Sequence, residues 1–384
     1  MSTKSDSFDV HAVFPNYYDG TRVSYSLAAI LEFITGPGLQ THTYVLGKAN
    51  GVGNEVSALL PLAGYRYSSK LVTRPADAIV KRFGRRMRPR DVVYFWLSNP
   101  PLLCQALQDR KLVVIREMIN CTLARRREEL TKAYGLLGLP DGSGISDAHI
   151  AQERSELLAA DGVFCPNEQV FESVVACGVP ASRCMRTSYG WSPARIAGNT
   201  QHLTKAAGLN LLFVGTAEIR KGFPWLLRAW EKAGVQGRLL IAGSIDPDVR
   251  NRYARLLQRP DVCDLGYVVD VGAVYRSADA FCFPTWEEGG PMVTIEAIGA
   301  GLPCIVTPMG TAGILSEQAG GALIVPPGDV DALAVAIRRM ALDHGLRTTA
   351  AQSARHLAAR YTWQEVGKRR REAIVRLRDQ VARP

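Results

Sequence analysis

Residues 283–297, FPTWEEGGPMVTIEA, have the form of a buried strand that passes through a glycine-containing loop into a helix. The strand should end at Pro284, and the two glycines that follow permit the backbone to approach a ligand closely. We expect the helix to begin near Pro291 or Met292, because proline is favoured in the first helical turn. The first amides of such a helix point toward an anion or a sugar oxygen, so this loop is a candidate binding site.

The same alternation of apolar runs and helix-like segments occurs in two series along the chain, which predicts parallel sheets covered by helices on both faces. The runs are Phe8–Phe14, Thr43–Leu46, Val92–Leu97, Leu112–Ile115 and Gly162–Cys165, then Leu209–Val214, Arg238–Ala242, Ala280–Phe283, Cys304–Val306 and Leu323–Val325. We expect two doubly wound domains, 1–190 and 205–362, with a linker within 189–207 and with the helix 363–384 packing back on the first domain. Ligands of such sheets bind beyond the carboxyl ends of the strands.

Composition is consistent with two globular domains. The chain has 384 residues, of which 47% are apolar and 21% charged. No apolar run reaches the roughly 18 to 20 residues of a membrane-spanning helix, and the polar start is unlike a secretory signal, so we expect a cytoplasmic protein. Eight cysteines without a Cys-x-x-Cys pair indicate buried free thiols, not zinc ligands or a disulfide framework.

The formal charge of +10 is compatible with nucleic acid, an anionic membrane or phosphorylated ligands as partners. Six basic residues gather in the stretch 81–90, namely Lys81, Arg82, Arg85, Arg86, Arg88 and Arg90, and Arg125–Arg127 follow later. This stretch is either an ordinary solvated face or an attachment to anionic lipid. The sequence leaves both interpretations open.

Two carboxylates and two cations are candidates for chemistry. Glu288 lies at the loop-to-helix junction and Glu296 about one turn into the helix, a pair that suits vicinal hydroxyls, although helix N-termini also favour acidic residues for electrostatic reasons. Arg220 and Lys221 follow the strand 209–214 and could hold a diphosphate and stabilise its growing negative charge, although ordinary surface cations would look the same.

In the first domain, Gly20 could bring backbone amides to a phosphate, and a plain strand-to-helix turn accounts for it nearly as well. The pair Gly51 and Gly53 is not followed by a third correctly placed glycine, and no Gly-Lys-Ser/Thr is present. Neither nicotinamide binding nor P-loop hydrolysis has support in the sequence.

Together these segments resemble the donor site of retaining glycosyltransferase family 4, which has the GT-B fold, two Rossmann-like domains facing a central cleft, and a Glu-x7-Glu hallmark. Glu288 and Glu296 have that spacing. Further matches are Ala297, Gly299–Val306, Val214-Gly215, Lys221-Gly222, Gly266–Val268, Ala278-Asp279 and Val325–Asp329. They cover almost all of the second domain.

The resemblance implies a role for each matching position. Glu296 would bind the donor ribose, Glu288 would approach the transferred sugar, and Lys221, with Arg220 beside it, would contact the diphosphate. Glu288, Lys221 and Arg220 are thus the catalytic candidates. Tyr267 and Val268 would lie near the base. The other donor-binding candidates are Gly20, Thr21, Gly215, Thr216, Gly289, Gly290, Pro291, Met292 and Val293.

This sequence departs from the family pattern at several positions. Gly215-Thr216-Ala217 replaces Gly-Arg-Leu, and Glu288-Gly289-Gly290-Pro291 replaces Glu-Gly-Phe-Gly. In the first domain Asp19-Gly20 replaces Gly-Gly. Arg116 and Glu117 stand where many members carry a histidine on the acceptor side, so they are the acceptor-side candidates.

The expected reaction is transfer of a sugar, with retention of configuration, from a nucleoside-diphosphate sugar to an acceptor hydroxyl in bacterial polysaccharide, lipopolysaccharide or glycolipid assembly. The donor is expected to be UDP- or GDP-linked, with UDP slightly favoured, and the acceptor a free or lipid-linked saccharide. We expect no cofactor and no metal, because Arg220, Lys221 and helix amides can neutralise the phosphates, and either a cytoplasmic protein or one peripheral on the inner face of the plasma membrane. An epimerase or a phosphorylase on the same fold is the alternative. A nucleic-acid-binding protein is disfavoured, because no stripe of interleaved aromatic and basic residues occurs.

Overall fold

The computed structural model describes residues 7–53, 55–62, 65, 69–316 and 320–381. Contacts divide the chain into unit 1, residues 1–123, 145–187 and 363–384, and unit 2, residues 124–144 and 188–362. These boundaries differ from the expected domains in two segments. Residues 124–144 cluster with unit 2, and the whole of the expected linker, 189–207, is also part of unit 2.

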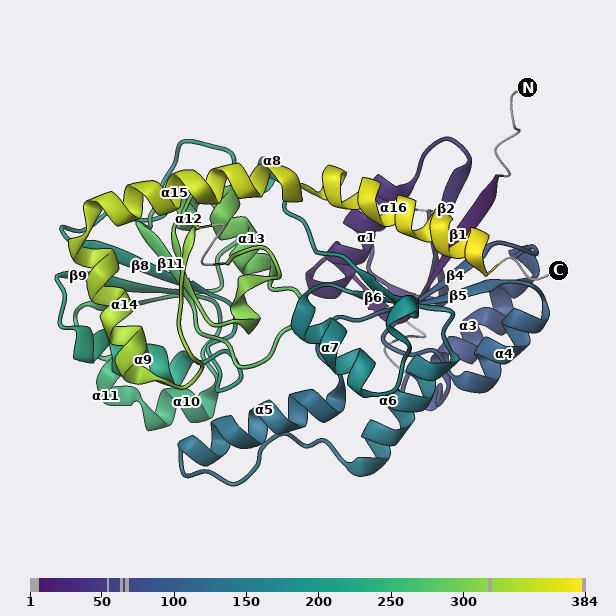
Figure 1. Cartoon of the computed structure of the whole chain (residues 1–384), viewed down its shortest axis with the longest axis horizontal. Helices are drawn as coiled ribbons and strands as arrows, with labels where there is room; N and C mark the ends of the chain where they lie inside the picture. The colour runs from purple at the N-terminus through teal and green to yellow at the C-terminus, as the bar shows by residue number, and fades with distance from the viewer. Residues whose placement is uncertain (1–6, 54, 63–64, 66–68, 317–319, 382–384) are drawn as a thin grey trace. The chain divides into compact units, whose positions relative to one another are not determined.

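Unit 1 is built on one parallel sheet of seven strands in the order β3-β2-β1-β4-β5-β6-β7 (Figure 1). The strands are β1 (Phe8–Tyr18), β2 (Leu39–Lys48), β3 (Val56–Leu60), β4 (Val92–Trp96), β5 (Val113–Glu117), β6 (Gly162–Cys165) and β7 (Cys184–Arg186). The helices of this part of the chain are α1 (Arg22–Ile34), α3 (Pro75–Phe83), α4 (Pro101–Asp109), α5 (Leu123–Leu136), α6 (Asp147–Ala159), α7 (Glu168–Ala176) and α16 (Trp363–Gln380), with 3-10 turns at Ser69–Leu71, Gly84–Arg86 and Ala181–Arg183. Most of α5 belongs to unit 2.

The two faces of this sheet are covered by different helices. Val93 and Phe95 of β4 pack into a core cluster with residues of α3 and α4. Tyr94, which lies between them, points to the opposite face, where its hydroxyl donates a hydrogen bond to Glu117 and accepts one from Arg370 of α16 at 2.9 Å. Since side chains alternate along a strand, a central strand buried on both faces is apolar at every position, as β4 is.

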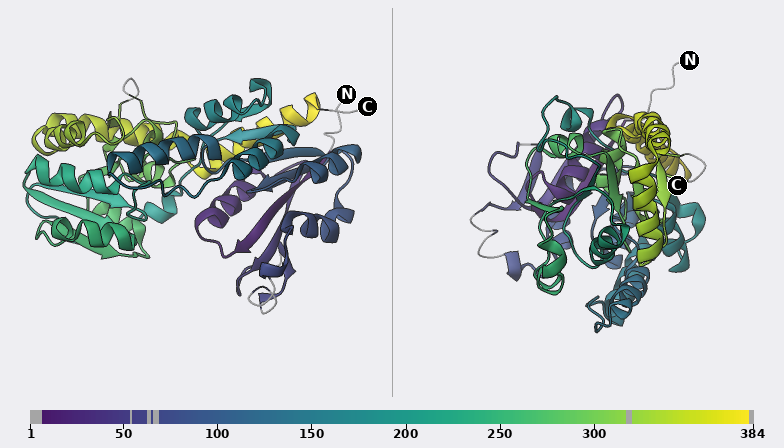
Figure 2. Two further views of the ribbon diagram at one scale, coloured as in Figure 1. Left: turned by 90° about the horizontal axis from the view of Figure 1, so that it is seen from below. Right: turned by 90° about the vertical axis from the view of Figure 1, so that its left-hand side faces the viewer.

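Unit 2 contains a parallel sheet of six strands in the order β10-β9-β8-β11-β12-β13, and helices lie on both faces of it (Figure 2). The strands are β8 (Leu209–Val214), β9 (Gly237–Ala242), β10 (Val262–Gly266), β11 (Ala280–Phe283), β12 (Cys304–Val306) and β13 (Ala322–Ile324). The helices are α8 (Pro193–Ile196), α9 (Phe223–Ala233), α10 (Pro247–Arg252), α11 (Ala254–Leu257), α12 (Val271–Arg276), α13 (Met292–Gly299), α14 (Val330–Leu342) and α15 (His344–Ala358), with 3-10 turns at Met309–Thr311 and Ala359–Tyr361. The prediction of two doubly wound parallel sheets is confirmed.

Parallel strands place all their carboxyl ends at one edge of a sheet, which locates the candidate residues. The turn 19–21 follows β1 in unit 1, and the loops 215–222 and 284–291 follow β8 and β11 in unit 2. The basic stretch 81–90 instead precedes β4, so it lies at the amino edge of the unit 1 sheet. This edge is opposite to the one on which ligands of such sheets bind.

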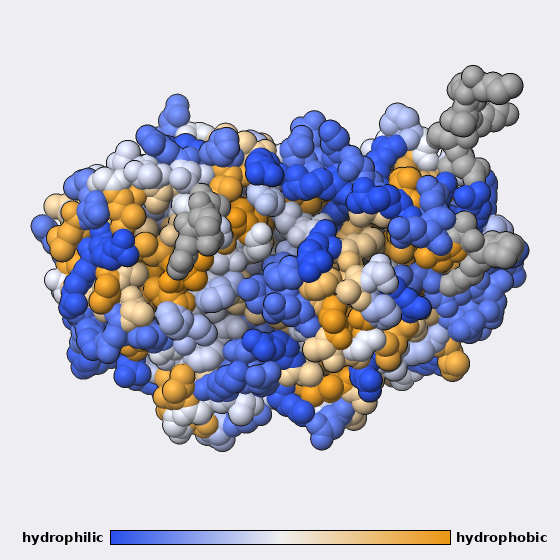
Figure 3. Space-filling model, in the orientation of Figure 1, coloured by the Kyte–Doolittle hydropathy of each residue, from blue (hydrophilic) through white to orange (hydrophobic). Residues whose placement is uncertain are grey.

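Among the described residues, the exposed large apolar side chains come from both units. On the face drawn in Figure 3, hydrophilic and hydrophobic residues are intermixed, and exposed large apolar side chains such as Leu71, Leu102 and Val269 are scattered along the chain. Within the described residues, no helix combines the length and the apolar character that crossing a bilayer requires. All eight cysteines are free thiols, as expected, although Cys177 and Cys263 are only half-buried.

Candidate functional site

Two loops at the carboxyl edge of the unit 2 sheet are held together by their backbones. Gly222 has a positive φ of 70°, and a β-carbon there would collide with the carbonyl oxygen of Pro284, so only glycine fits. The amide of Trp286 donates to the carbonyl of Arg220 at 2.9 Å, and the Thr285 hydroxyl donates to the same oxygen at 3.1 Å. The loop after β8 and the loop after β11 therefore form one frame.

This frame brings the two predicted cations onto the first predicted carboxylate. Nη1 of Arg220 donates to Oε1 of Glu288 at 3.2 Å and to the carbonyl of Glu287 at 3.0 Å. The Lys221 ammonium forms an ion pair with the same Oε1 of Glu288. Arg220 is also held from the other side by Glu218, at 2.8 Å. The two cations expected to bind a diphosphate thus both contact Glu288.

Lys221 has an unusual protonation equilibrium. Burial, and then the positive charge of Arg220, lower the pKa of Lys221 to about 7, although Glu218 and Glu287 act in the opposite direction. An anion placed beside this amine favours its charged form. The site can therefore take up a proton when a phosphate group arrives near neutral pH.

Three charged residues of this cluster were not expected from the sequence. The Glu287 carboxylate is fully buried, and its Oε2 lies 3.5 Å from Nη1 of Arg220 and 3.6 Å from Nε of Arg126 on α5. Glu218 completes the set. Glu287 is adjacent to Glu288, a signal that could have been used, whereas Arg126 stood out only as part of a basic run. The pair with Glu287 helps to explain why this part of α5 clusters with unit 2.

The second predicted carboxylate has partners of its own. Glu296 lies in α13 and is only 5% exposed. Its Oε1 is 3.2 Å from Nε of Arg195, and its Oε2 is 3.3 Å from the hydroxyl of Tyr275. Burial raises the pKa of Glu296, while Arg195 and the Tyr275 hydrogen bond oppose that shift. Neither Arg195 nor Tyr275 was singled out in the sequence.

The other candidates of unit 2 lie around the same edge of the sheet. Gly215 and Thr216 follow β8, and a β-carbon at Gly215 would meet no atom within 4 Å. Tyr267, directly after β10, is 83% exposed, and Val268 is half-buried. The helix α13 begins at Met292, where the sequence predicted it. Of the remaining candidates, Gly289, Gly290 and Pro291 are buried, and Met292 and Val293 are half-buried.

In unit 1, Gly20 and Thr21 lie in an exposed turn after β1. The Asp19 carboxylate organises this turn, because its Oδ1 accepts hydrogen bonds from the Thr21 amide at 2.9 Å and from the hydroxyls of Thr21 and Ser24 at 2.8 and 2.9 Å. Gly20 has a φ of 75° and open space around its α-carbon. The turn is accessible, as a phosphate-binding turn must be.

The acceptor-side candidates Arg116 and Glu117 lie in the interior of unit 1. Arg116 donates to Oδ1 of Asn99 at 3.1 Å and lies 3.6 Å from Glu156. Glu117 forms a fully buried pair with Arg370, at 2.8 Å. Both side chains are directed at partners within the core, so the structure gives them a part in folding and corrects the expectation that they face an acceptor.

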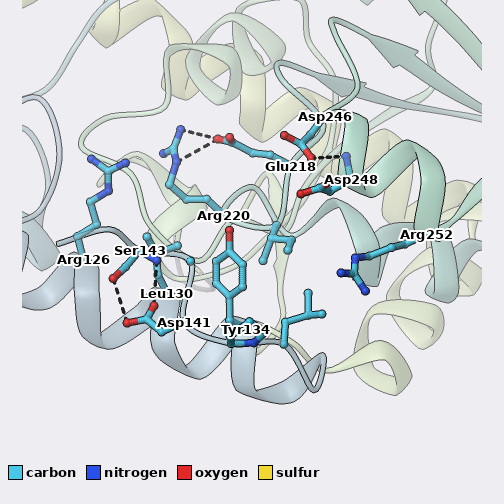
Figure 4. Close-up of a pocket in the computed structure, with 14 residues that line it drawn as sticks. Arg126, Leu130, Tyr134, Asp141, Ser143, Glu218, Arg220, Asp246, Asp248 and Arg252 are labelled. Carbon is cyan, nitrogen blue, oxygen red and sulfur yellow. Dashed lines mark hydrogen bonds and ion pairs between the residues drawn. The ribbon is translucent and has the colours of Figure 1, made fainter.

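A polar pocket that the sequence did not reveal lies beside Arg220. Its volume is about 480 Å³, and it is bounded by α5 and by the loops after β8 and β9. In Figure 4 the Tyr134 hydroxyl points toward Arg220 and Glu218. Burial, and then the charges of Asp246 and Glu218, raise the pKa of Tyr134, so this hydroxyl stays protonated and able to donate. The pocket offers hydrogen-bonding groups within reach of the charged cluster.

Among the described residues, one group of side chains has the composition of a metal site, and it lies elsewhere. Ligand atoms of Asp9, His11 and Asp91 gather within 4.8 Å at the amino edge of the unit 1 sheet. Hydrogen bonds already engage them: Nε2 of His11 lies 3.0 Å from Asp91, its Nδ1 lies 3.3 Å from the Tyr44 hydroxyl, and the Arg88 amide donates to Asp91 at 2.8 Å. We interpret the group as a polar cluster of the core.

Comparison with known proteins identifies the second unit. Residues 208–343 match the family described as glycosyl transferases group 1. Unit 2 contains a glycosyl transferases group 1 domain. This glycosyltransferase domain includes Glu296, Tyr267 and five members of the charged cluster, namely Glu218, Arg220, Lys221, Glu287 and Glu288. The sixth member, Arg126, lies outside the matched range. Arg195 lies outside the matched range.

Two curated relatives are similar over part of their length. The capsular polysaccharide biosynthesis glycosyltransferase CapM of Staphylococcus aureus is 28% identical over 167 residues, 40% of this chain and 43% of that protein. The phosphatidyl-myo-inositol mannosyltransferase of Mycobacterium leprae is 27% identical over 267 residues, 64% of this chain and 69% of that protein. The match spans about two fifths of the length of the first curated relatives, at 42%, 43% and 42%.

A solved structure shows the same architecture over the whole chain. Anabaena HepE in complex with UDP and glucose superposes with a TM-score of 0.67 at 13% identity and covers 96% of this chain and 100% of that one. At this level of identity the likeness shows the fold alone. The whole chain has two parallel sheets with flanking helices, and this architecture is the GT-B fold.

Proposed function

We propose that this chain is a retaining glycosyltransferase that moves a sugar from a nucleoside diphosphate to an acceptor hydroxyl. The observation that carries the proposal is the cluster of Arg220, Lys221 and Glu288 at the carboxyl edge of a glycosyl transferases group 1 domain. Cations at that position suit a diphosphate, and an adjacent carboxylate suits sugar hydroxyls.

In the proposed reaction, the donor diphosphate takes the two cations from Glu288. Glu288 is then available to the transferred sugar. As the bond from the anomeric carbon to the diphosphate oxygen breaks, Lys221 and Arg220 stabilise the charge that grows on the leaving group. The acceptor oxygen forms its bond to the anomeric carbon on the same face, and its proton passes to a phosphate oxygen. No protein nucleophile and no metal is required by this route.

The proposed substrates follow from the relatives and from the exposed positions at the site. UDP is the favoured nucleotide, since HepE was solved with UDP and glucose, and GDP is the second choice. The exposed Tyr267 ring and Val268 offer a surface for the base. A saccharide acceptor, free or lipid-linked, is proposed because CapM acts in capsular polysaccharide biosynthesis. Product analysis with and without acceptor separates this transferase from an epimerase, which needs none.

Replacing Glu296 with alanine should weaken binding of the nucleotide itself. Its proposed partners are ribose hydroxyls, which are present in the ground state and the transition state alike. The loss of charged hydrogen bonds should cost about 1.5 to 3 kcal/mol of binding free energy. Calorimetry with UDP, GDP and ADP measures it, and an unchanged dissociation constant would remove Glu296 from the site.

The basic stretch 81–90 is proposed to attach the enzyme to anionic lipid. All six of its basic side chains are exposed, whereas Phe83 and Met87 are buried, so the charges form one face toward solvent. Each such residue near an anionic surface contributes on the order of 1 kcal/mol. Because the stretch lies at the amino edge of its sheet, attachment there leaves the carboxyl edge of the same sheet unobstructed.

Co-sedimentation with vesicles tests the attachment. The protein should pellet with anionic vesicles at low salt, less at physiological salt, and not with neutral vesicles. Replacing Arg82, Arg85, Arg86 and Arg88 with serine should abolish the effect, whereas replacing the exposed Arg250 and Arg255 of unit 2 should not. Equal recovery on both vesicle types would show that the stretch is only a solvated face.

A further inference from the structure

The segment that joins the two sheets is fixed to unit 2 next to α13. Arg276 of α12 donates to the carbonyls of Ile196 at 2.5 Å, Ala197 at 3.1 Å and Thr200 at 2.6 Å. The indole of Trp191 donates to the carbonyl of Ala358 at 2.8 Å. These bonds come from side chains to backbone atoms, so they fix the path of residues 191–200.

Close packing holds the short helix α8 of this segment in place. A β-carbon at Gly272 of α12 would collide with the carbonyl of Arg195, and one at Gly299 of α13 would collide with the Trp191 ring. The absence of these side chains lets α8 approach both helices. Arg195 is therefore presented to α13, the helix that carries Glu296.

The ionised form of Glu296 needs a compensating group, and Arg195 is one. A carboxylate that is 5% exposed is costly to ionise unless charged or hydrogen-bonding groups compensate for the lost water. The structure supplies a cation, Nε of Arg195 at 3.2 Å from Oε1, and a hydroxyl, that of Tyr275 at 3.3 Å from Oε2. Arg195 is itself 44% exposed, so it compensates the buried carboxylate while remaining hydrated.

We propose that Arg195 is a positioning residue for the donor nucleotide: it keeps Glu296 ionised and oriented so that both carboxylate oxygens can accept hydrogen bonds from ribose hydroxyls. The inference rests on the proposed function and adds to it a residue from outside the matched domain. An ionised carboxylate accepts at both oxygens, whereas a protonated one loses part of that capacity. The connecting segment thereby becomes part of the donor site.

If Arg195 had a competing role, its removal would have the opposite effect on nucleotide affinity. If Arg195 occupied the place of the ribose hydroxyls, it would compete with the nucleotide, and its removal would strengthen binding. The sign of the change in affinity therefore decides between positioning and competition.

The experiment titrates UDP, GDP and ADP into the full chain by calorimetry at pH 6, 7 and 8. The variants are Arg195→Ala, Arg195→Lys and the control Arg255→Ala, which removes an exposed arginine paired with Glu231 at 2.7 Å in the same unit. For the nucleotide that binds tightest, Arg195→Ala should weaken affinity about tenfold at pH 7, the order of one hydrogen bond to a charged group that is no longer correctly oriented. Arg195→Lys should retain most of the affinity, and Arg255→Ala all of it.

The pH dependence adds a readout that a merely structural role would not move. Without Arg195 the Glu296 carboxyl should take up a proton at higher pH, so the loss in Arg195→Ala should be larger at pH 6 than at pH 8. Circular dichroism and thermal melting show whether the variant is folded, and the lysine variant provides the test if it is not.

Each outcome has one meaning. Wild-type or tighter binding by Arg195→Ala at every pH overturns the positioning role. If Glu296→Ala loses binding while Arg195→Ala does not, this inference fails and the proposed function stands. If the wild-type chain binds none of the three nucleotides, the proposed function fails, and the inference fails with it.

Discussion

Replacing Lys221 with alanine should lower turnover by about 10²- to 10³-fold, the scale for the loss of one preorganised group that stabilises transition-state charge. The Lys221 side chain is only 14% exposed and lies beside Arg220 and Glu288, so solvent screens its charge little. Steady-state kinetics on the purified variant measures the loss. Lys232→Ala is the matched control, because Lys232 is an exposed lysine of the same unit, paired with Asp331.

The pH profile provides a second measurement of the same role. The pKa of Lys221 is lowered to about 7, so the free enzyme loses this charge as the pH rises through 7. A diphosphate binds the charged form, and kcat/KM of the wild type should therefore fall above that pH. Lys221→Ala should lack this decline. Full activity in the variant would refute the assignment of Lys221 to the leaving group.

Replacing Arg370 with methionine should destabilise unit 1 by about 3 to 5 kcal/mol, the usual cost of removing one partner from a buried ion pair. Arg370 of α16 donates to both oxygens of Glu117, at 2.8 and 3.0 Å, and to the Tyr94 hydroxyl at 2.9 Å. Its removal leaves the Glu117 charge in the core without its ion-pair partner. Urea unfolding followed by circular dichroism gives the free energy.

Two further variants distinguish the loss of the buried ion pair from the general effect of removing a cation from α16. Lys368→Met changes an exposed cation on the same helix and should alter stability by no more than about 0.5 kcal/mol. Adding Glu117→Gln to Arg370→Met should recover part of the loss, because no uncompensated charge then remains. A single Arg370→Met variant as stable as the wild type would show that the pair contributes little.

How far the strands could be predicted depended on their place in each sheet. The central strands β6, β8, β11 and β12 were predicted with the bounds that the structure shows, because burial on both faces makes a parallel strand apolar throughout. The three strands that the sequence did not reveal, β3, β7 and β10, are all at sheet edges. These three strands are partly exposed and lack that continuous pattern, whereas the fourth edge strand, β13, was predicted one residue out of place.

The candidate site was predictable where its residues are close in sequence. Glu288 and Glu296 lie on one strand-loop-helix segment of unit 2, and Arg220 and Lys221 lie on another, so local patterns indicated each pair. The loops of both segments lie at the carboxyl edge of the same sheet because their strands are parallel. This arrangement brings Lys221 and Arg220 onto Glu288. The assignment of the donor and the acceptor stays a prediction.

The sequence by itself determined the two parallel sheets, the start of α13 and the identity of the charged residues at the carboxyl edge, because these depend on local periodicity, on glycine and proline, and on strand polarity. Only the tertiary structure decided which charges meet. Glu117 and Arg370 are 253 positions apart and form a core pair instead of an acceptor site, while Arg195 reaches Glu296 from a segment without periodicity. Such pairs leave no mark in the local sequence, because burial and partner are set by how distant elements pack.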